Sequence, residues 1–229
     1  MLDIVLLELE GVIIDTSEAR RDAISASLRA DGILLPDQEY RDLCAGLSFE
    51  DAMRAAFRGV GHGRDETAMA IAAHRAERAY RAYIGKGLTL VEGARETLER
   101  LHGSIRLGLV TRSPRNDAMF VLSLARIEHL FTSVVAQEDA PPKPSPEPYR
   151  LALARMQRTR TRVVRGTVVA IEDGLPGVTA ARAAGIATVV VGDVPAHVAI
   201  EADGYVPSIA GLTADSLLSL VAPRNEPIV

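Results

Sequence analysis

The stretch that decides the fold of this chain is a short apolar run followed by acidic residues and a glycine: Ile4-Val5-Leu6-Leu7-Glu8-Leu9-Glu10-Gly11-Val12-Ile13-Ile14-Asp15-Thr16. An uninterrupted aliphatic run of this length is typical of a strand buried on both faces of a parallel sheet. Acidic residues that follow such a strand lie at its carboxyl end, where ligands bind in α/β folds. The stretch therefore predicts a buried strand and one corner of a functional site.

Further short apolar runs follow, and helical stretches separate them. We predict strands at Ile4–Leu7, 105–111, 133–136, 168–171, Ala187–Val191 and Gly204–Val206. We predict helices at 92–101, 116–126, 146–156, 176–184 and 213–221. Strands that alternate with helices in this way predict an α/β fold, with a doubly wound parallel sheet as its core.

Residues 16–87 break the alternation. This segment is rich in alanine and arginine, contains no convincing strand, and is divided into helical pieces by glycines. A helical segment of this length is too long for a simple crossover between two neighbouring strands. We therefore predict a core domain of residues 1–15 and 88–229, with an inserted all-helical cap domain of residues 16–87.

The composition excludes several classes of protein. The chain has 229 residues and a net charge of −4, so nothing electrostatic favours binding to nucleic acid or to an anionic membrane. Its only cysteine, Cys44, excludes an internal disulfide and is compatible with a cytoplasmic location. A buried core residue is favoured over a reactive thiol at this position. Both a monomer and a homodimer remain open.

Polar side chains follow the other predicted strands as well. Those expected at the same sheet edge are Glu8, Glu10, Thr111, Lys143, Glu172 and Asp173. Four carboxylates in one place repel each other unless a cation neutralises them, and hard oxygen ligands select Mg²⁺. A cation, a lysine and a hydroxyl suit a phosphoryl group, and a carboxylate can attack phosphorus to form an acyl phosphate.

This ordered set resembles the haloacid dehalogenase superfamily, in the helical-cap branch that holds phosphoglycolate-phosphatase-like enzymes and β-phosphoglucomutases. The family's first motif is Asp-x-Asp-Gly-[Thr/Val]-x-x-Asp-[Ser/Thr], and residues 8–16 match it except that Glu8 and Glu10 replace the two catalytic aspartates. Thr111 matches the second motif and Lys143 the third. The fourth, metal-binding motif is matched by Glu172-Asp173 together with Gly177 and the Ala-Ala-Gly run that follows.

The resemblance implies a role for each of these residues. Glu8 would be the nucleophile and a Mg²⁺ ligand. Glu10 would be the general acid and base, with its backbone carbonyl as a further metal ligand. Glu172 and Asp173 would complete the metal site. Lys143 would hold the nucleophile and the transferring phosphoryl group, Thr111 would bind phosphate, and the cap would select the substrate.

The two glutamates bear directly on activity. Each added methylene moves a carboxylate by up to about 1.5 Å, and a misplacement of about 1 Å can cost on the order of a hundredfold in rate. We therefore predict a slow Mg²⁺-dependent phosphomonoester hydrolase that acts on a small phosphorylated metabolite. The alternative is a silent relative that binds Mg²⁺ or a phospho-ligand in a regulatory role.

A phosphosugar mutase is disfavoured by two departures from the mutase pattern. Arg20 stands where the mutases carry a histidine, and Phe49 follows a cap loop that lacks their arginine. For Arg20 a solvated helix position is favoured over contact with an anionic substrate, and for Phe49 packing is favoured over substrate contact. Arg112 is an equal choice between binding the substrate or its phosphate and forming a surface ion pair. Residues 155–165 are basic and predict an exposed connection.

Overall fold

The computed structural model describes residues 1–44, 47–59, 66–157 and 167–222. The chain divides into two compact units, which we treat separately. The core unit comprises Met1–Asp15 and Thr89–Val229, and the helical unit comprises Thr16–Leu88. The role of the helical unit as a cap stays a prediction.

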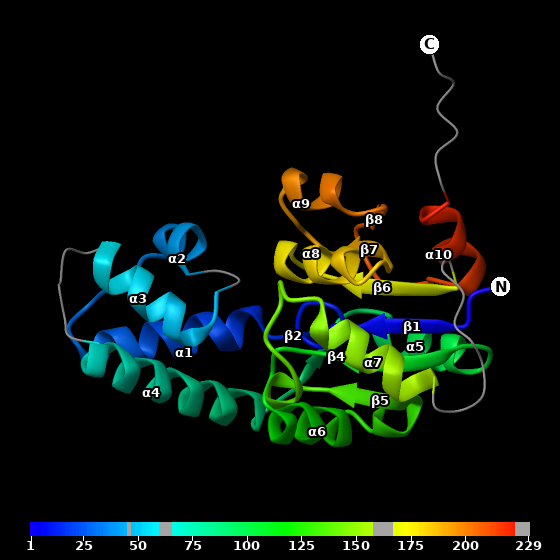
Figure 1. Cartoon of the computed structure of the whole chain (residues 1–229). Coiled ribbons are helices and arrows are strands. Elements are labelled where there is room, and N and C mark those ends of the chain that lie inside the picture. Colours follow the sequence, from blue (N-terminus) through cyan, green and yellow to red (C-terminus); the bar gives the residue numbers. More distant parts are fainter. Residues whose placement is uncertain (45–46, 60–65, 158–166, 223–229) are drawn as a thin grey trace, which may run out of the picture. The chain divides into compact units, whose positions relative to one another are not determined.

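The core unit is built on one parallel sheet (Figure 1). Its strands are β1 (Ile4–Leu7), β4 (Arg106–Val110), β5 (Phe131–Val135), β6 (Val168–Glu172), β7 (Ala187–Val191) and β8 (Gly204–Val206). Their order across the sheet is β5-β4-β1-β6-β7-β8, and all neighbouring strands are parallel. Strand β1 lies inside the sheet with all four residues buried, as its apolar run predicts. The predicted α/β class with a parallel sheet is confirmed.

Helices connect and cover the strands of this sheet. They are α5 (Ala94–His102), α6 (Arg115–Leu124), α7 (Glu147–Gln157), α8 (Leu175–Ala183), α9 (Ala196–Glu201) and α10 (Ala214–Leu220). Helices α7 and α8 pack on the face that carries Ile4 and Leu6. Gly108 permits close packing there, because a Cβ at this position would lie 2.7 Å from Leu6 Cδ2 and 2.9 Å from Met156 Sδ. The core therefore sits directly beside the strand ends that form the candidate site.

Three features of the core unit were not predicted. Strands β2 (Ile14–Asp15) and β3 (Thr89–Leu90) form a small antiparallel pair, and helix α9 follows β7. Helix α5 begins at Ala94 rather than at residue 92, because Gly93 before it adopts a φ of 72°, a left-handed conformation that ends the preceding turn. The basic connection predicted over residues 155–165 has only its first three residues in the described part of the chain.

An acidic residue near the edge of the core unit is held by two arginines. Asp139 accepts hydrogen bonds from Arg155, at 3.0 Å to Oδ1, and from Arg115. The hydrogen bond from Arg155 is the main cause that lowers the pKa of Asp139 to about 2, and the Ala136 N–H and the charge of Arg115 act in the same direction. This cluster joins α6, α7 and the segment after β5.

The helical unit contains α1 (Ser17–Ala30), α2 (Asp37–Leu43), α3 (Phe49–Gly59) and α4 (Glu66–Ile84). Its buried core includes Ile24, Met53, Phe57 and Cys44. The Cys44 thiol lies 3.5 Å from the Ala52 carbonyl oxygen, and burial raises its pKa to about 11, as expected for an inert core thiol. Among the described residues, no helix is long and apolar enough to cross a membrane.

Candidate active site

Three adjacent strands bring the central residues of the site together. Leu7 is paired with Leu109 of β4 on one side and with Ile171 of β6 on the other. The residues that follow in each strand, among them Glu8 and Glu172, therefore emerge at the same carboxyl edge of the sheet. Thr111 follows β4 and is held there by its N–H, which donates to the Val135 carbonyl oxygen at 2.9 Å.

Lys143 joins two carboxylates inside this edge. Its Nζ donates to Glu8 Oε2 at 2.7 Å, to Glu172 Oε1 at 2.5 Å and to the Val110 carbonyl oxygen at 2.8 Å. The exposed fractions of the side chains are 2% for Lys143, 8% for Glu8 and 2% for Glu172. Three of the predicted site residues thus meet in one buried ionic cluster, although they are far apart in the sequence.

The electrostatics of this cluster favour a charged lysine. Burial alone would lower the pKa of Lys143, but Glu172 and Glu8 outweigh it, so the pKa is raised and the ammonium is retained. Burial raises the pKa of Glu172, and Glu8 adds to the rise, while Lys143 opposes it. One ammonium shared between two carboxylates leaves an excess of negative charge in a poorly solvated place.

Glu8 is held at both carboxyl oxygens. Oε2 accepts from Lys143, and Oε1 accepts from the Leu9 N–H at 2.7 Å. The longer side chain of this glutamate is therefore retained within the site. The cluster positions the candidate nucleophile, but it also engages both oxygens that could attack.

Glu10 has a partner that was not among the predicted site residues. The Ser113 hydroxyl donates to Glu10 Oε1 at 3.0 Å, and the Ser113 N–H donates to Thr111 Oγ1 at 3.1 Å. The strand end after β4 therefore contacts both the candidate acid and the candidate phosphate-binding hydroxyl. A serine two residues after Thr111, at the same sheet edge, was the signal in the sequence that could have identified this contact.

Tyr149 is a second residue that the sequence analysis missed. It lies in the first turn of α7, is fully buried, and donates from its hydroxyl to Glu172 Oε1. Burial, together with the charge of Glu172, raises the pKa of Tyr149 well above its ordinary value, so the hydroxyl keeps its proton and acts as a donor. A tyrosine on the buried stripe of a helix needs a polar partner, and this requirement was the available signal.

Two glycines leave room for acidic side chains of the site. A Cβ at Gly177 would lie 2.0 Å from Glu172 Cδ, and a Cβ at Gly11 would lie 2.2 Å from Asp173 Oδ2. Gly11 also has a φ of 77°, which disfavours any side chain at this position. Both glycines are thus required by the positions of the two carboxyls.

The raised pKa of the Asp173 carboxyl indicates that the site carries uncompensated negative charge. Its pKa is raised to about 8, first by burial in the surrounding site and then by the like charges of Glu172 and Glu8, which Lys143 and Arg112 offset in part. The residue itself is exposed at the surface, so water weakens the first of these causes, while the like charges keep the direction upward.

The donor chemistry and the charge of these residues fit a divalent cation. Carboxylate oxygens are the ligands that Mg²⁺ prefers, and two positive charges would cancel the excess negative charge. Within the part of the chain that the structure describes, no three His, Cys, Asp or Glu side chains are already gathered as a metal-holding group. Glu8 and Glu172 instead direct one oxygen each toward Lys143. The ligand set of Glu8, Glu10, Glu172 and Asp173 stays a prediction.

Arg20 and Phe49 contact each other inside the helical unit. The Arg20 guanidinium lies 4.3 Å from the centroid of the Phe49 ring and donates to the Leu47 carbonyl oxygen, while the Phe49 and Tyr80 rings are 5.5 Å apart. Arg20 lies on helix α1 as predicted and is partly exposed, and one face of its guanidinium packs on an aromatic ring. Packing as the role of Phe49 is consistent with these contacts.

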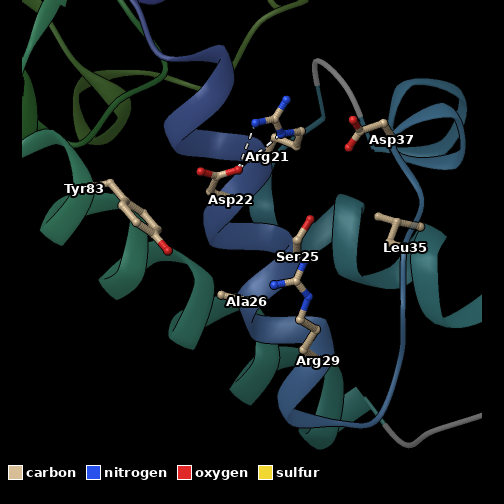
Figure 2. Close-up of a pocket in the computed structure, with 8 residues that line it drawn as sticks. All are labelled: Arg21, Asp22, Ser25, Ala26, Arg29, Leu35, Asp37 and Tyr83. Carbon is tan, nitrogen blue, oxygen red and sulfur yellow. Dashed lines mark hydrogen bonds and ion pairs between the residues drawn. The ribbon is translucent and has the colours of Figure 1, made fainter.

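A separate polar pocket lies within the helical unit (Figure 2). Its volume is about 340 Å³, and it is lined by Arg21, Asp22, Ser25, Ala26, Arg29, Leu35, Asp37 and Tyr83. Its two arginines are matched by two aspartates, and Arg21 forms an ion pair with Asp22 at 3.1 Å. All of its residues come from the helical unit, so the pocket contains none of the strand-end carboxylates.

The parallel sheet and the acidic and lysine side chains at its carboxyl edge define an α/β enzyme site. The chain belongs to the haloacid dehalogenase-like hydrolase family, whose sequence profile matches residues 5–191. The resemblance noted in the sequence is thereby confirmed at the level of the family.

Individual relatives agree with this assignment. The chain is 29% identical over 191 residues to a validoxylamine A 7'-phosphate phosphatase of Streptomyces hygroscopicus subsp. limoneus, covering 81% of this chain and 84% of the relative. It is 32% identical over 161 residues to the pyrophosphatase PpaX of Bacillus velezensis, covering 66% and 68%. A solved β-phosphoglucomutase of Clostridium difficile shares the fold, with a TM-score of 0.79, 20% identity, and coverage of 96% and 97%.

Proposed function

We propose that this protein is a Mg²⁺-dependent phosphatase that hydrolyses a small phosphomonoester through a carboxylate nucleophile. The observation that carries the proposal is the buried cluster in which Lys143 binds both Glu8 and Glu172 at the carboxyl edge of the sheet. Membership of the hydrolase family and the phosphatase names of two relatives support it.

In the first half of the reaction, Glu8 attacks the phosphorus atom of the bound ester. A bond forms between a Glu8 oxygen and phosphorus, the bond from phosphorus to the ester oxygen breaks, and that oxygen leaves with a proton from Glu10. In the second half, Glu10 removes a proton from water, whose oxygen attacks phosphorus. The bond to Glu8 then breaks, and inorganic phosphate is released.

The remaining residues bind and orient the phosphoryl group. Lys143 neutralises its developing charge, and Thr111 and Arg112 are the proposed binding groups on the neighbouring strand end. Ser113 holds the Glu10 carboxyl at 3.0 Å and limits the added freedom of the longer side chain. These contacts are the means by which the site accommodates glutamates in place of the family's aspartates.

Glu8, Glu172 and Asp173, together with the Glu10 backbone carbonyl, would hold Mg²⁺. When bound, the cation would supply charge neutralisation and orientation of the phosphoryl oxygens. Donor type and excess negative charge support this assignment.

One observation favours a second function, that of a silent relative which binds Mg²⁺ or a phospho-ligand. Both oxygens of Glu8 already accept short hydrogen bonds, and each bond withdraws electron density from the oxygen that would attack. The two functions differ in turnover and share the binding site, and therefore the same assay separates them.

The test is hydrolysis of p-nitrophenyl phosphate and of a panel of small phosphosugars, with and without Mg²⁺. The wild type is compared with Glu8→Ala, with Glu8→Asp/Glu10→Asp and with Glu128→Ala, an exposed control. We expect slow Mg²⁺-dependent turnover that Glu8→Ala abolishes and Glu128→Ala leaves unchanged. Activity that appears only in the double aspartate variant would support the silent relative, and turnover that survives Glu8→Ala would contradict the proposal.

A further inference from the structure

The Tyr149 hydroxyl restrains Glu172 from the buried cluster in which the Tyr149 ring lies. It donates to Glu172 Oε1, the same oxygen that accepts from Lys143. On the other side, a Cβ at Gly177 would lie 2.0 Å from Glu172 Oε2, so the helix backbone closes off that direction. The Glu172 carboxyl is therefore fixed by a tyrosine, a lysine and a glycine.

Packing does not explain why this residue is a tyrosine. Its ring lies in the apolar cluster that includes Ile4, Leu6 and Val110, and it is fully buried. A phenylalanine would fill nearly the same space without the cost of burying a hydroxyl. The hydroxyl has one described partner, and that partner is Glu172.

The three hydrogen bonds of Lys143 suggest what the hydrogen bond from Tyr149 to Glu172 is for. An ammonium has three N–H donors, and Lys143 already serves three acceptors: Glu8, Glu172 and the Val110 carbonyl oxygen. To bind a phosphoryl group, the lysine has to turn at least one donor away from these acceptors. When Lys143 turns away, Tyr149 can still hold Glu172, because its own hydrogen bond to Glu172 does not depend on the lysine.

We propose that Tyr149 is a positioning residue that keeps the Glu172 carboxyl oriented toward the cation and releases Lys143 to serve the phosphoryl group. The inference rests on the proposed function, in which Glu172 binds Mg²⁺. Tyr149 contacts no reacting atom and acts through Glu172. Partners of this kind, one step behind a metal ligand, typically contribute about ten- to a hundredfold in metal affinity or activity.

The experiment measures cation binding directly, by titration calorimetry with Mg²⁺ and Mn²⁺ in the absence of substrate. Tyr149→Phe keeps the ring and removes the hydroxyl, and Tyr205→Phe, on an exposed strand residue, is the matched control. We expect Tyr149→Phe to raise the Kd for the cation about tenfold and the control to leave it unchanged. Circular dichroism verifies that each variant is folded.

Kinetics and a double mutant separate positioning from a structural effect. The Mg²⁺ concentration for half-maximal activity should rise about tenfold in Tyr149→Phe. Saturating Mg²⁺ should restore kcat to within about twofold of the wild type, because the bound cation then holds Glu172 and Lys143 is released as before. In a Glu172→Ala background, Tyr149→Phe should change cation affinity no further, because the oxygen that accepts from the hydroxyl is already absent.

Two results would overturn the inference. One is cation binding by Tyr149→Phe that equals that of the wild type, and the other is an equal loss of affinity with and without Glu172→Ala. The proposed function can fail independently: a wild type that binds Mg²⁺ and hydrolyses no phosphoester would contradict the phosphatase, while the binding comparison would still decide the role of Tyr149.

Discussion

Replacing Lys143 by methionine tests the electrostatic basis of the site. The substitution keeps most of the aliphatic length and removes an ammonium that serves Glu8, Glu172 and the Val110 carbonyl oxygen. Breaking a buried ion pair on one side costs about 3–5 kcal/mol, because the remaining charge stays buried without compensation. We expect a loss of about that size in the free energy of unfolding, measured in EDTA at pH 8.

The pH dependence of this loss follows from the carboxyls that remain. The pKa of Glu172 is already raised above its ordinary value, and removing Lys143, which opposes the rise, raises it further. A carboxyl with a raised folded pKa contributes stability below its unfolded pKa and loses it as the pH rises through the folded pKa. The penalty of Lys143→Met should therefore be smaller at pH 5 than at pH 8, and added Mg²⁺ should recover part of it at pH 8.

The assay is urea denaturation followed by circular dichroism, with Lys86→Met as the control. Lys86 is exposed in the helical unit and lies 5.7 Å from the Tyr83 ring centroid, so its replacement should cost about 1 kcal/mol or less. A Lys143→Met penalty no larger than that of the control, or one that is equal at pH 5 and pH 8, would show that the buried ion pairs do not cause the loss.

Three other substitutions probe the surroundings of the site. Gly177→Ala should weaken Mg²⁺ binding in calorimetry and lower the free energy of unfolding by about 1–3 kcal/mol, since the new Cβ would overlap the buried Glu172 carboxyl. The control is Gly174→Ala, whose Cβ would have only an ordinary neighbour at 3.7 Å, and equal effects of the two substitutions would contradict the predicted overlap. Asp139→Asn should remove stability that the wild type has above about pH 4 and loses as the pH falls through about 2, so thermal unfolding of the two should converge in acid. Ser113→Ala should lower kcat by about tenfold and leave the melting temperature nearly unchanged, because the Glu10 carboxyl loses the hydrogen bond that positions it. An unaltered kcat would show that Ser113 does not position Glu10 for catalysis.

The sequence was sufficient to predict that Glu8, Lys143 and Glu172 lie together at the carboxyl edge of the sheet. Apolar runs located the strands well, and the bounds of β1 and β7 agree with the structure residue for residue. Glu8, Lys143 and Glu172 were each placed after a strand or before a helix, and parallel topology brings such positions together. The meeting of these three residues therefore follows from where they stand along the chain relative to the strands and helices.

The contacts that depend on side-chain direction were not predictable in the same way. Whether Tyr149 points toward Glu172 depends on how α7 is rotated on the sheet, and whether Ser113 reaches Glu10 depends on the turn after β4. The contact between Arg20 and Phe49 was not predicted, because an arginine on a helix gives no sign in sequence of an aromatic partner elsewhere in the unit. Strand pairs as short as β2 and β3 carry too few residues for a detectable pattern.

The central claim is that Glu8 is the nucleophile, and trapping the covalent intermediate tests it most directly. The enzyme would be mixed with p-nitrophenyl phosphate and Mg²⁺ and quenched with hydroxylamine, which converts an acyl phosphate to a hydroxamate, and the modified peptide would be identified by mass spectrometry. We expect a hydroxamate on Glu8 that is absent without substrate. Turnover with no modification of Glu8, or with modification of another carboxyl, would contradict that claim.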